Sequence, residues 1–168
     1  MNKPKIIILR GNSGSGKTTT AKALQERIGR GTLLISQDEV RREMLWVRSG
    51  KDNKSIDLIR HLVRFGYEHC EVTILEGILY ADEHVELFEE VKRLFGKHIY
   101  AYFYNLSFEE TLKRHGEKQK VKLHTFGEPD MRKWWRDKDL LPNIEENLVK
   151  QDMNLCSVVD WICKEIRV

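Results

Sequence analysis

The sequence contains few cysteines and no long apolar run. Three of its 168 residues are cysteine, at positions 70, 156 and 163, and no C-x-x-C pair occurs. An odd set without paired spacing excludes a disulfide framework and favours a reducing cytoplasm. Cys156 and Cys163 lie seven positions apart, so we expect both on one helix face as small core residues.

No stretch approaches the ~18 apolar residues of a membrane span. The first expected strand begins near residue 5, which leaves no room for a signal peptide. The net charge of +3 is too small to imply nucleic-acid binding by itself, although it is compatible with an anionic substrate. The six histidines show no metal-ligand spacing. We therefore expect a cytoplasmic protein without a membrane partner, either a monomer or a homodimer.

The remaining pattern alternates strands and helices within one domain that covers residues 1–168. Such alternation predicts an α/β fold with a parallel sheet. Ser36 and Glu39 fit a capping box, and Ser107 and Glu110 fit a second one. The expected strands cover residues 5–9, 32–35, 72–75, 98–104 and 144–149, and the expected helices cover 16–28, 37–46, 55–70, 82–95, 107–115, 130–137 and 155–166.

One short motif carries the most chemical information. Residues 11–18 match G-x-x-x-x-G-K-[ST], the phosphate-binding loop, between an apolar strand and an expected helix. Glycines permit a backbone whose amides turn inward to form an anion nest, and the helix N-terminus adds a positive dipole end. Lys17 can reach the β- and γ-phosphates, and the Thr18 hydroxyl can ligate Mg²⁺. The predicted ATP-binding residues are Gly11, Asn12, Ser13, Gly14, Ser15, Gly16, Lys17, Thr18, Thr19 and Arg114.

Two further segments follow expected strands and should meet the loop, because parallel strands place ligands beyond their carboxyl ends. Asp38 and Arg41 lie three positions apart and share one helix face, where Asp38 could act as a general base and Arg41 could orient the acceptor. The alternative is an ordinary surface ion pair. Glu76 ends an apolar strand and could hold Mg²⁺ directly or through water, or it could cap a helix.

A basic segment over residues 114–139 predicts a mobile lid that closes over the phosphates. Arg114, Arg132 and Arg136 are the stronger candidates, because arginine binds phosphate through two donors. The lysines of this region, at positions 113, 118, 120, 122 and 133, are better explained as solvated side chains. Trp134 and Trp135 could line a substrate or adenine pocket, although packing of the lid onto the domain is favoured.

Together the loop 11–18, the pair Asp38 and Arg41, and the strand end at Glu76 resemble the P-loop kinase group. This group includes zeta toxins, chloramphenicol phosphotransferase and the kinase half of polynucleotide kinase. The resemblance implies a three-layer fold with a five-stranded parallel sheet of order 2-3-1-4-5, helices on both faces and a short lid. It also implies that Asp38 is the base, that Arg41 contacts the acceptor and that Arg114 contacts ATP. Many members carry aspartate where this chain has Glu76.

The leading hypothesis is therefore an ATP- and Mg²⁺-dependent phosphotransferase that acts on a hydroxyl acceptor, most simply a small molecule. A polynucleotide 5′-hydroxyl is a second acceptor, for which Lys51, Lys54, Arg60, Arg64, Trp46 and Trp134 could supply a basic, aromatic channel. A regulatory ATPase without an acceptor is a third hypothesis. A GTPase switch is disfavoured, because the sequence has no N-K-x-D motif.

Overall fold

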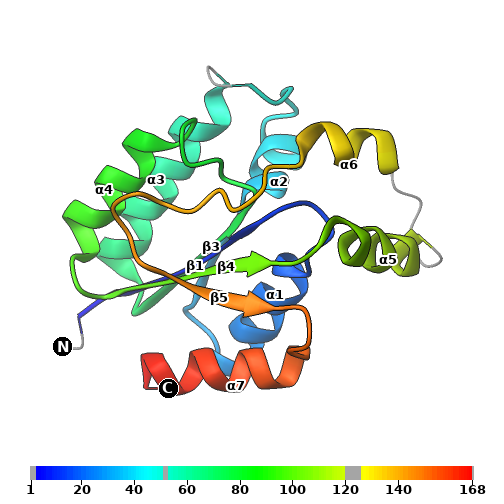
Figure 1. The fold of residues 1–168 in the computed structure, drawn as a ribbon. Coiled ribbons are helices and arrows are strands. Elements are labelled where there is room, and N and C mark those ends of the chain that lie inside the picture. The colour runs from blue at the N-terminus through cyan, green and yellow to red at the C-terminus, as the bar shows by residue number, and fades with distance from the viewer. Residues whose placement is uncertain (1–2, 51–52, 120–125, 168) are drawn as a thin grey trace.

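The computed structural model describes residues 3–50, 53–119 and 126–167. Five parallel strands form one sheet in the order β2-β3-β1-β4-β5, which confirms the expected topology (Figure 1). The strands are β1 Lys5–Gly11, β2 Leu33–Ser36, β3 Val72–Gly77, β4 Ile99–Asn105 and β5 Glu146–Lys150. The helices are α1 Lys17–Ile28, α2 Gln37–Glu39, the π-helix η1 Val40–Met44, α3 Lys54–His69, α4 Val85–Phe95, α5 Phe108–Gln119, α6 Glu128–Trp134 and α7 Leu155–Ile166.

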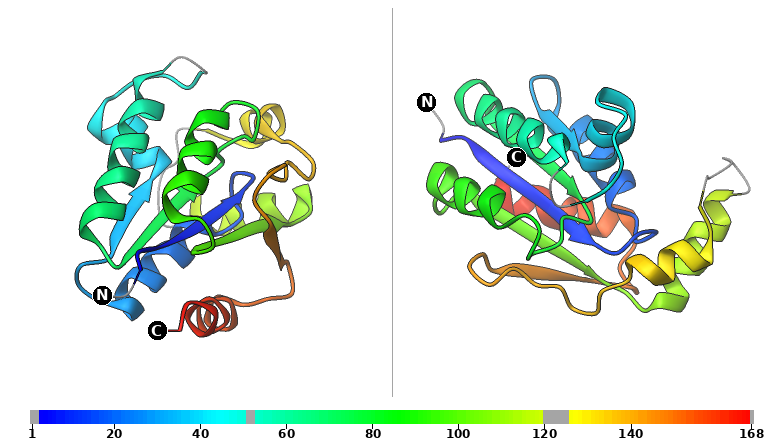
Figure 2. Two further views of the ribbon diagram at one scale, coloured as in Figure 1. Left: turned by 90° about the vertical axis from the view of Figure 1, so that its left-hand side faces the viewer. Right: turned by 90° about the horizontal axis from the view of Figure 1, so that it is seen from above.

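Helices cover both faces of the sheet, with α3 and α4 on one face and α1 and α7 on the other (Figures 1 and 2). Alternate side chains of β1 pack against the two helical layers, because neighbouring side chains of a strand point to opposite faces. Ile6 and Ile8 pack toward α3 and α4, whereas Ile7 and Leu9 pack toward α1 and α7. Both faces are buried, as the nearly continuous apolar runs of the strands predict.

The carboxyl ends of the central strands meet at one edge of the sheet, where α5 and α6 extend beyond it (Figure 1). The register pairs Leu9 with Glu76 and Ser36 with Glu76, so the ends of β1, β2 and β3 are level. This alignment brings the predicted loop 11–18 next to the residues that follow β2 and β3. A cavity lined by residues of the loop and of the segments after β2 and β3 lies at this edge.

Several local predictions are corrected by the structure. The expected helix over residues 37–46 is one α-turn followed by η1, and Ser36 does not cap it with its side chain. The short helix expected at residues 130–137 lies at Glu128–Trp134, and α5 is longer than expected. Cys163 is buried, but Cys156 is exposed, because it lies in the first turn of α7 rather than over the core. Ser107 does cap α5, since its hydroxyl accepts from the amide of Glu110 at 3.2 Å.

A buried arginine that the sequence analysis did not identify joins β1 to the segment before β5. Arg10 is fully buried at the end of β1 and donates to both carboxylate oxygens of Glu146 at 2.9 Å. It also donates to the carboxylate of Asp139 at 2.9 Å and to the carbonyl of Leu79 at 3.0 Å. A buried charge must be paired in this way, because desolvation otherwise costs several kcal/mol. The pairing fixes the base of the predicted lid beside the phosphate loop.

No helix among the described residues is long and apolar enough to cross a bilayer.

Candidate active site

The loop 11–18 has the conformation that an anion nest requires. Gly11, Gly14 and Gly16 have positive φ angles of 142°, 78° and 97°. A Cβ at Gly14 would lie 2.8 Å from the carbonyl oxygen of Thr111, so both the backbone angle and the packing require glycine there. Residues 13 and 14 form a turn, and within the described residues the backbone amides of Ser13, Gly14 and Gly16 donate no hydrogen bond. These amides are therefore available to phosphate oxygens.

Lys17 begins α1 directly after this loop and is 7% exposed. Its ammonium group donates to the carbonyl of Asn12 at 2.8 Å and to the hydroxyl of Ser15 at 3.1 Å. Both acceptors belong to the loop, so the charge is held over the nest rather than in solvent. The β- and γ-phosphates of a nucleotide in this nest would lie within reach of the Lys17 ammonium group.

Two hydroxyl groups converge on one carboxylate oxygen at the end of β3. Glu76 is 2% exposed, and its Oε1 accepts from Thr18 at 3.1 Å and from Ser36 at 2.5 Å. Ser36 thus donates its hydroxyl hydrogen to Glu76 instead of capping the next helix, because the parallel register of β2 and β3 places Ser36 beside Glu76. Oxygen ligands of this kind suit Mg²⁺, which keeps several waters and binds through one or two protein groups. Thr18 and Glu76 could therefore hold the metal together with phosphate oxygens.

Asp38 lies in α2, at the entrance to the same crevice. Its carboxylate contacts the guanidinium groups of Arg41 at 3.0 Å and of Arg42 at 3.6 Å, and its side chain is 65% exposed. Asp38 and Arg41 share one face, as expected, and form the ion pair of the alternative interpretation. Arg42, rather than Arg41, lines the crevice together with Asp38. The sequence analysis considered only the i,i+3 partner of Asp38 and missed Arg42, which lies four positions on and contacts the same carboxylate.

A cavity of about 180 Å³ connects the loop with these side chains. His115 of α5 and Phe126 form part of its wall, and their rings are stacked with centroids 4.9 Å apart. The guanidinium of Arg42 lies 5.5 Å from the ring centroid of Phe126. No local sequence signal marks His115 or Phe126, because only the docking of the lid region brings them to the loop. The residues that line the cavity are Ser13, Gly14, Lys17, Thr18, Gln37, Asp38, Arg42, Glu76, Gly77, Ile78, His115 and Phe126.

A larger cavity of about 910 Å³ opens on the other side of the loop. It is lined by Gly16, Thr18, Thr19 and Arg114, and by apolar residues of β5 and α7. Arg114 donates to the carbonyl of Ser15 at 3.0 Å and is oriented by Glu110 at 2.9 Å. The two cavities share Thr18, so one polyphosphate chain could pass from the larger cavity to the smaller one.

The other lid arginines have different partners. Arg132 pairs with Glu128 and lies 4.4 Å from the ring centroid of Phe108. Arg136 lies 3.7 Å from the ring centroid of Tyr80 and pairs with Asp82 and Glu83. Neither lines the cavities next to the loop, so Arg114 is the lid arginine that the structure brings to the loop 11–18. The lysine side chains at positions 118, 120 and 122 lie outside the described part.

Trp135 packs the lid region against the start of α5, whereas Trp134 packs within the lid region. Trp135 makes an edge contact with Phe108 at 5.3 Å, and Trp134 makes one with Phe126 at 5.2 Å. The side chain of Asn12 both donates to the carbonyl of Arg136 at 2.8 Å and accepts from its amide at 3.0 Å. Asn12 therefore ties the phosphate loop to the chain that follows α6, which is a structural role beside the predicted nucleotide contact.

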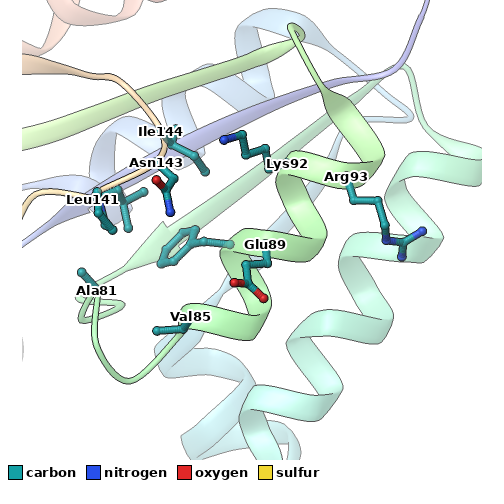
Figure 3. A pocket seen from close by; sticks show the side chains of 10 residues that line it. Ala81, Val85, Glu89, Lys92, Arg93, Leu141, Asn143 and Ile144 are labelled. Carbon is teal, nitrogen blue, oxygen red and sulfur yellow. The ribbon is translucent and has the colours of Figure 1, made fainter.

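A third cavity, of about 410 Å³, lies between α4 and the segment before β5 (Figure 3). Its wall includes Ala81, Val85, Leu141 and Ile144, with Lys92 and Asn143 at its margin. It contains none of the predicted site residues and is mostly apolar. We therefore place the chemistry at the loop and not in this cavity. The described residues contain no cluster of three or more His, Cys, Asp or Glu side chains that could hold a metal ion.

Comparisons with known proteins agree with this geometry. Residues 6–80 match a family model described as an AAA domain. A search of curated protein sequences finds no match. Among solved structures, the chain is similar to a gluconokinase from Sinorhizobium meliloti 1021, with 16% identity, a TM-score of 0.68, and coverage of 99% of this chain and 94% of that one.

Two other solved structures have the same arrangement. One is the APS kinase CysC of Mycobacterium tuberculosis in complex with AMPPNP and APS, with 15% identity, a TM-score of 0.69 and full coverage of both chains. The other is the tunicamycin resistance protein of Deinococcus radiodurans, with 19% identity, a TM-score of 0.63, and coverage of 97% of this chain and 95% of that one. Identities this low establish the fold and leave the substrate of this chain open.

Proposed function

We propose that this chain, which has the fold of the P-loop kinases, transfers the γ-phosphate of ATP to the hydroxyl group of a small molecule. One observation carries the proposal: a single cavity of about 180 Å³ is lined by Lys17, Thr18, Glu76 and Asp38. A cation for phosphate, a candidate metal site and an exposed carboxylate are the groups that such a transfer needs. The solved kinase structures of the same fold support this assignment.

The reaction assigns a task to each group. The acceptor hydroxyl oxygen forms a bond to the γ-phosphorus, the bond from that phosphorus to the β-γ bridging oxygen breaks, and ADP leaves. Asp38 accepts the hydroxyl proton, while Lys17 and the loop amides stabilise charge on the phosphate oxygens. Arg114 adds a positive charge from the lid, where its contact with the Ser15 carbonyl already holds it. Mg²⁺, when bound by Thr18 and Glu76, would neutralise further charge on the β- and γ-phosphates.

The size of the cavity favours a small acceptor. Its volume of about 180 Å³ is below the range of about 300–1,000 Å³ that is typical of ligand sites. Arg42 and the exposed Asp38 lie at the same entrance, so the acceptor must offer polar groups beside the reacting hydroxyl.

The polynucleotide alternative is less well supported. Arg60 and Arg64, which would have to contact a nucleic-acid backbone, both pair with Glu90 across α3 and α4. Trp134 packs against Phe126 instead of presenting a free stacking face. Trp46 is 92% exposed, and Lys51 lies outside the described residues. A basic aromatic channel of the kind expected is therefore not assembled among the described residues.

A screen with γ-labelled ATP tests the proposal. The protein is incubated with Mg²⁺, labelled ATP and a panel of small alcohols, with a 5′-hydroxyl oligonucleotide and with no acceptor. We expect label in one class of small alcohol, and no label with the Asp38→Asn variant. Label in the oligonucleotide would favour the second acceptor class. Equal hydrolysis with and without acceptors would identify a regulatory ATPase and overturn the proposal.

A further inference from the structure

His84 is a buried histidine that contacts Gln37, the residue before Asp38. His84, at the start of α4, is 3% exposed. Its Nδ1 lies 3.0 Å from the backbone carbonyl oxygen of Tyr80, and its Nε2 lies 3.4 Å from Nε2 of the Gln37 side chain. Gln37 and His84 lie 47 positions apart in the sequence, so the tertiary fold brings them into contact.

Gln37 is held on three sides. Its Oε1 accepts from the backbone amide of Leu79 at 3.2 Å, and its Nε2 faces His84. Gln37 also packs against Gly77, where an added Cβ would lie 2.5 Å from Oε1 and 2.6 Å from the Gln37 Cβ. The side chain lines the crevice and directly precedes Asp38 in the one-turn helix α2. Gln37 and Asp38 are consecutive residues of this short helix, so a displacement of Gln37 would move Asp38 as well.

The hydrogen-bond chemistry allows one protonation state. A carbonyl oxygen only accepts, so Nδ1 of His84 must carry the hydrogen that faces Tyr80. The Oε1 of Gln37 accepts from Leu79, so its Nε2 is the donor toward His84. Nε2 of His84 must then accept, which requires a neutral imidazole. A protonated ring would place two donors against each other and push the Gln37 side chain away.

We propose that His84 is a positioning residue that fixes Gln37, and through it Asp38, only while its imidazole is neutral, so that phosphate transfer falls as the pH drops. This inference rests on the proposed function. The surroundings include charges of both signs: Asp82 and Glu83 precede His84, Arg10 approaches from β1, and Arg60, Asp57 and Glu86 line the groove on its other side. Burial lowers the pKa of His84 and outweighs the carboxylates, which act in the opposite direction.

The first measurement pairs a pH–activity profile with NMR titration of the His84 ring. Below the pKa of His84, kcat should fall about tenfold per pH unit, as for loss of one required unprotonated group. The KM for ATP should change little, because the phosphate loop is not displaced. The amide signals of Gln37 and Asp38 should shift with the same midpoint as the His84 ring. The matched control is His69→Asn, which removes an exposed histidine of α3 and should leave the profile unchanged.

The second measurement uses Gln37→Glu, which keeps an acceptor for the Leu79 amide and turns the other oxygen toward Nε2 of His84. A protonated imidazole then becomes the favoured partner, so the NMR midpoint of His84 should rise. The acid decline of kcat at the parent midpoint should disappear. An unchanged His84 midpoint, or the parent acid limb in Gln37→Glu, would overturn the inference. Absence of transfer at every pH would refute the proposed function, while the NMR midpoints would still decide whether His84 controls Gln37 and Asp38.

Discussion

The Thr18 hydroxyl and the Glu76 carboxylate lie 3.1 Å apart, although 58 positions separate them in the sequence. The contact joins the first turn of α1 to the end of β3, beneath the space where phosphate would enter. Ser36 reaches the same carboxylate oxygen from β2. The ends of β2 and β3 and the first turn of α1 thus place one buried acid and two hydroxyls around a single point, and this arrangement underlies the proposed use of Mg²⁺.

Glu76→Gln should preserve the fold and weaken magnesium binding. The amide oxygen of glutamine can still accept from Thr18 and Ser36, but the negative charge is lost. We expect about 10- to 100-fold weaker Mg²⁺ affinity in the nucleotide complex, measured by titrating Mg²⁺ into protein with a non-hydrolysable ATP analogue. Glu71→Gln, at the exposed position before β3, is the control. Equal Mg²⁺ affinity in Glu76→Gln and the parent would remove Glu76 from the metal site.

Asp38→Asn should retain ATP binding and lose transfer. The asparagine keeps the size of the side chain but cannot accept the hydroxyl proton, so kcat should fall about 10²- to 10⁴-fold. The neighbouring Glu39→Gln is the control, because Glu39 pairs only with the exposed Lys22 among the described residues, at 3.6 Å. A rate within a few-fold of the parent would make Asp38 an ordinary helix-end residue.

Because of Glu90, the free energy of unfolding should depend on pH in the acid range. Burial by itself raises the pKa of Glu90, but hydrogen bonds from Arg64 and Arg60 outweigh it and lower the pKa below the ordinary value. The Glu90 carboxylate therefore binds a proton more readily in the unfolded chain than in the folded one. The stabilisation is fully present above the pKa of glutamate in the unfolded chain, about 4.3. It is lost as the pH falls through the lower pKa that Glu90 has in the folded state.

Urea unfolding of the parent and Glu90→Gln at several pH values checks this. The variant should be about 1–3 kcal/mol less stable near neutral pH, as for loss of charged hydrogen bonds, and the difference should shrink below about pH 4. Glu89→Gln, at an exposed position of the same helix, should match the parent throughout. A pH-independent difference for Glu90→Gln would show that Glu90 acts through packing alone.

Sequence reasoning succeeded where the signal was local and periodic. The loop 11–18 and the placement of Glu76 at a strand end follow from motif spacing and alternating elements, whereas the strand order was implied by the resemblance to the P-loop kinases. It failed where a residue's partner comes from a distant segment. Arg10 lies in an apolar run, yet its carboxylate partners Asp139 and Glu146 are 129 and 136 positions away.

The same reason explains most of the errors around the crevice. Ser36 fits a helix cap locally, but the register of β2 and β3 offers it the stronger acceptor Glu76. Arg42 was missed because only the i,i+3 partner of Asp38 was considered, although the arginine at i+4 contacts the same carboxylate. His115 and Phe126 reach the crevice only through packing of the lid region, which no spacing in the sequence encodes.

Calorimetric titration of the protein with Mg²⁺ and a non-hydrolysable ATP analogue tests the central claim most directly. The amides of the loop 11–18 and the ammonium of Lys17 should bind one nucleotide per chain, and Lys17→Ala should weaken binding about 10- to 100-fold through loss of charged hydrogen bonds. Lys97→Ala, an exposed lysine after α4, should bind like the parent. No measurable heat with the parent, or equal affinity of Lys17→Ala and the parent, would contradict the phosphate site itself.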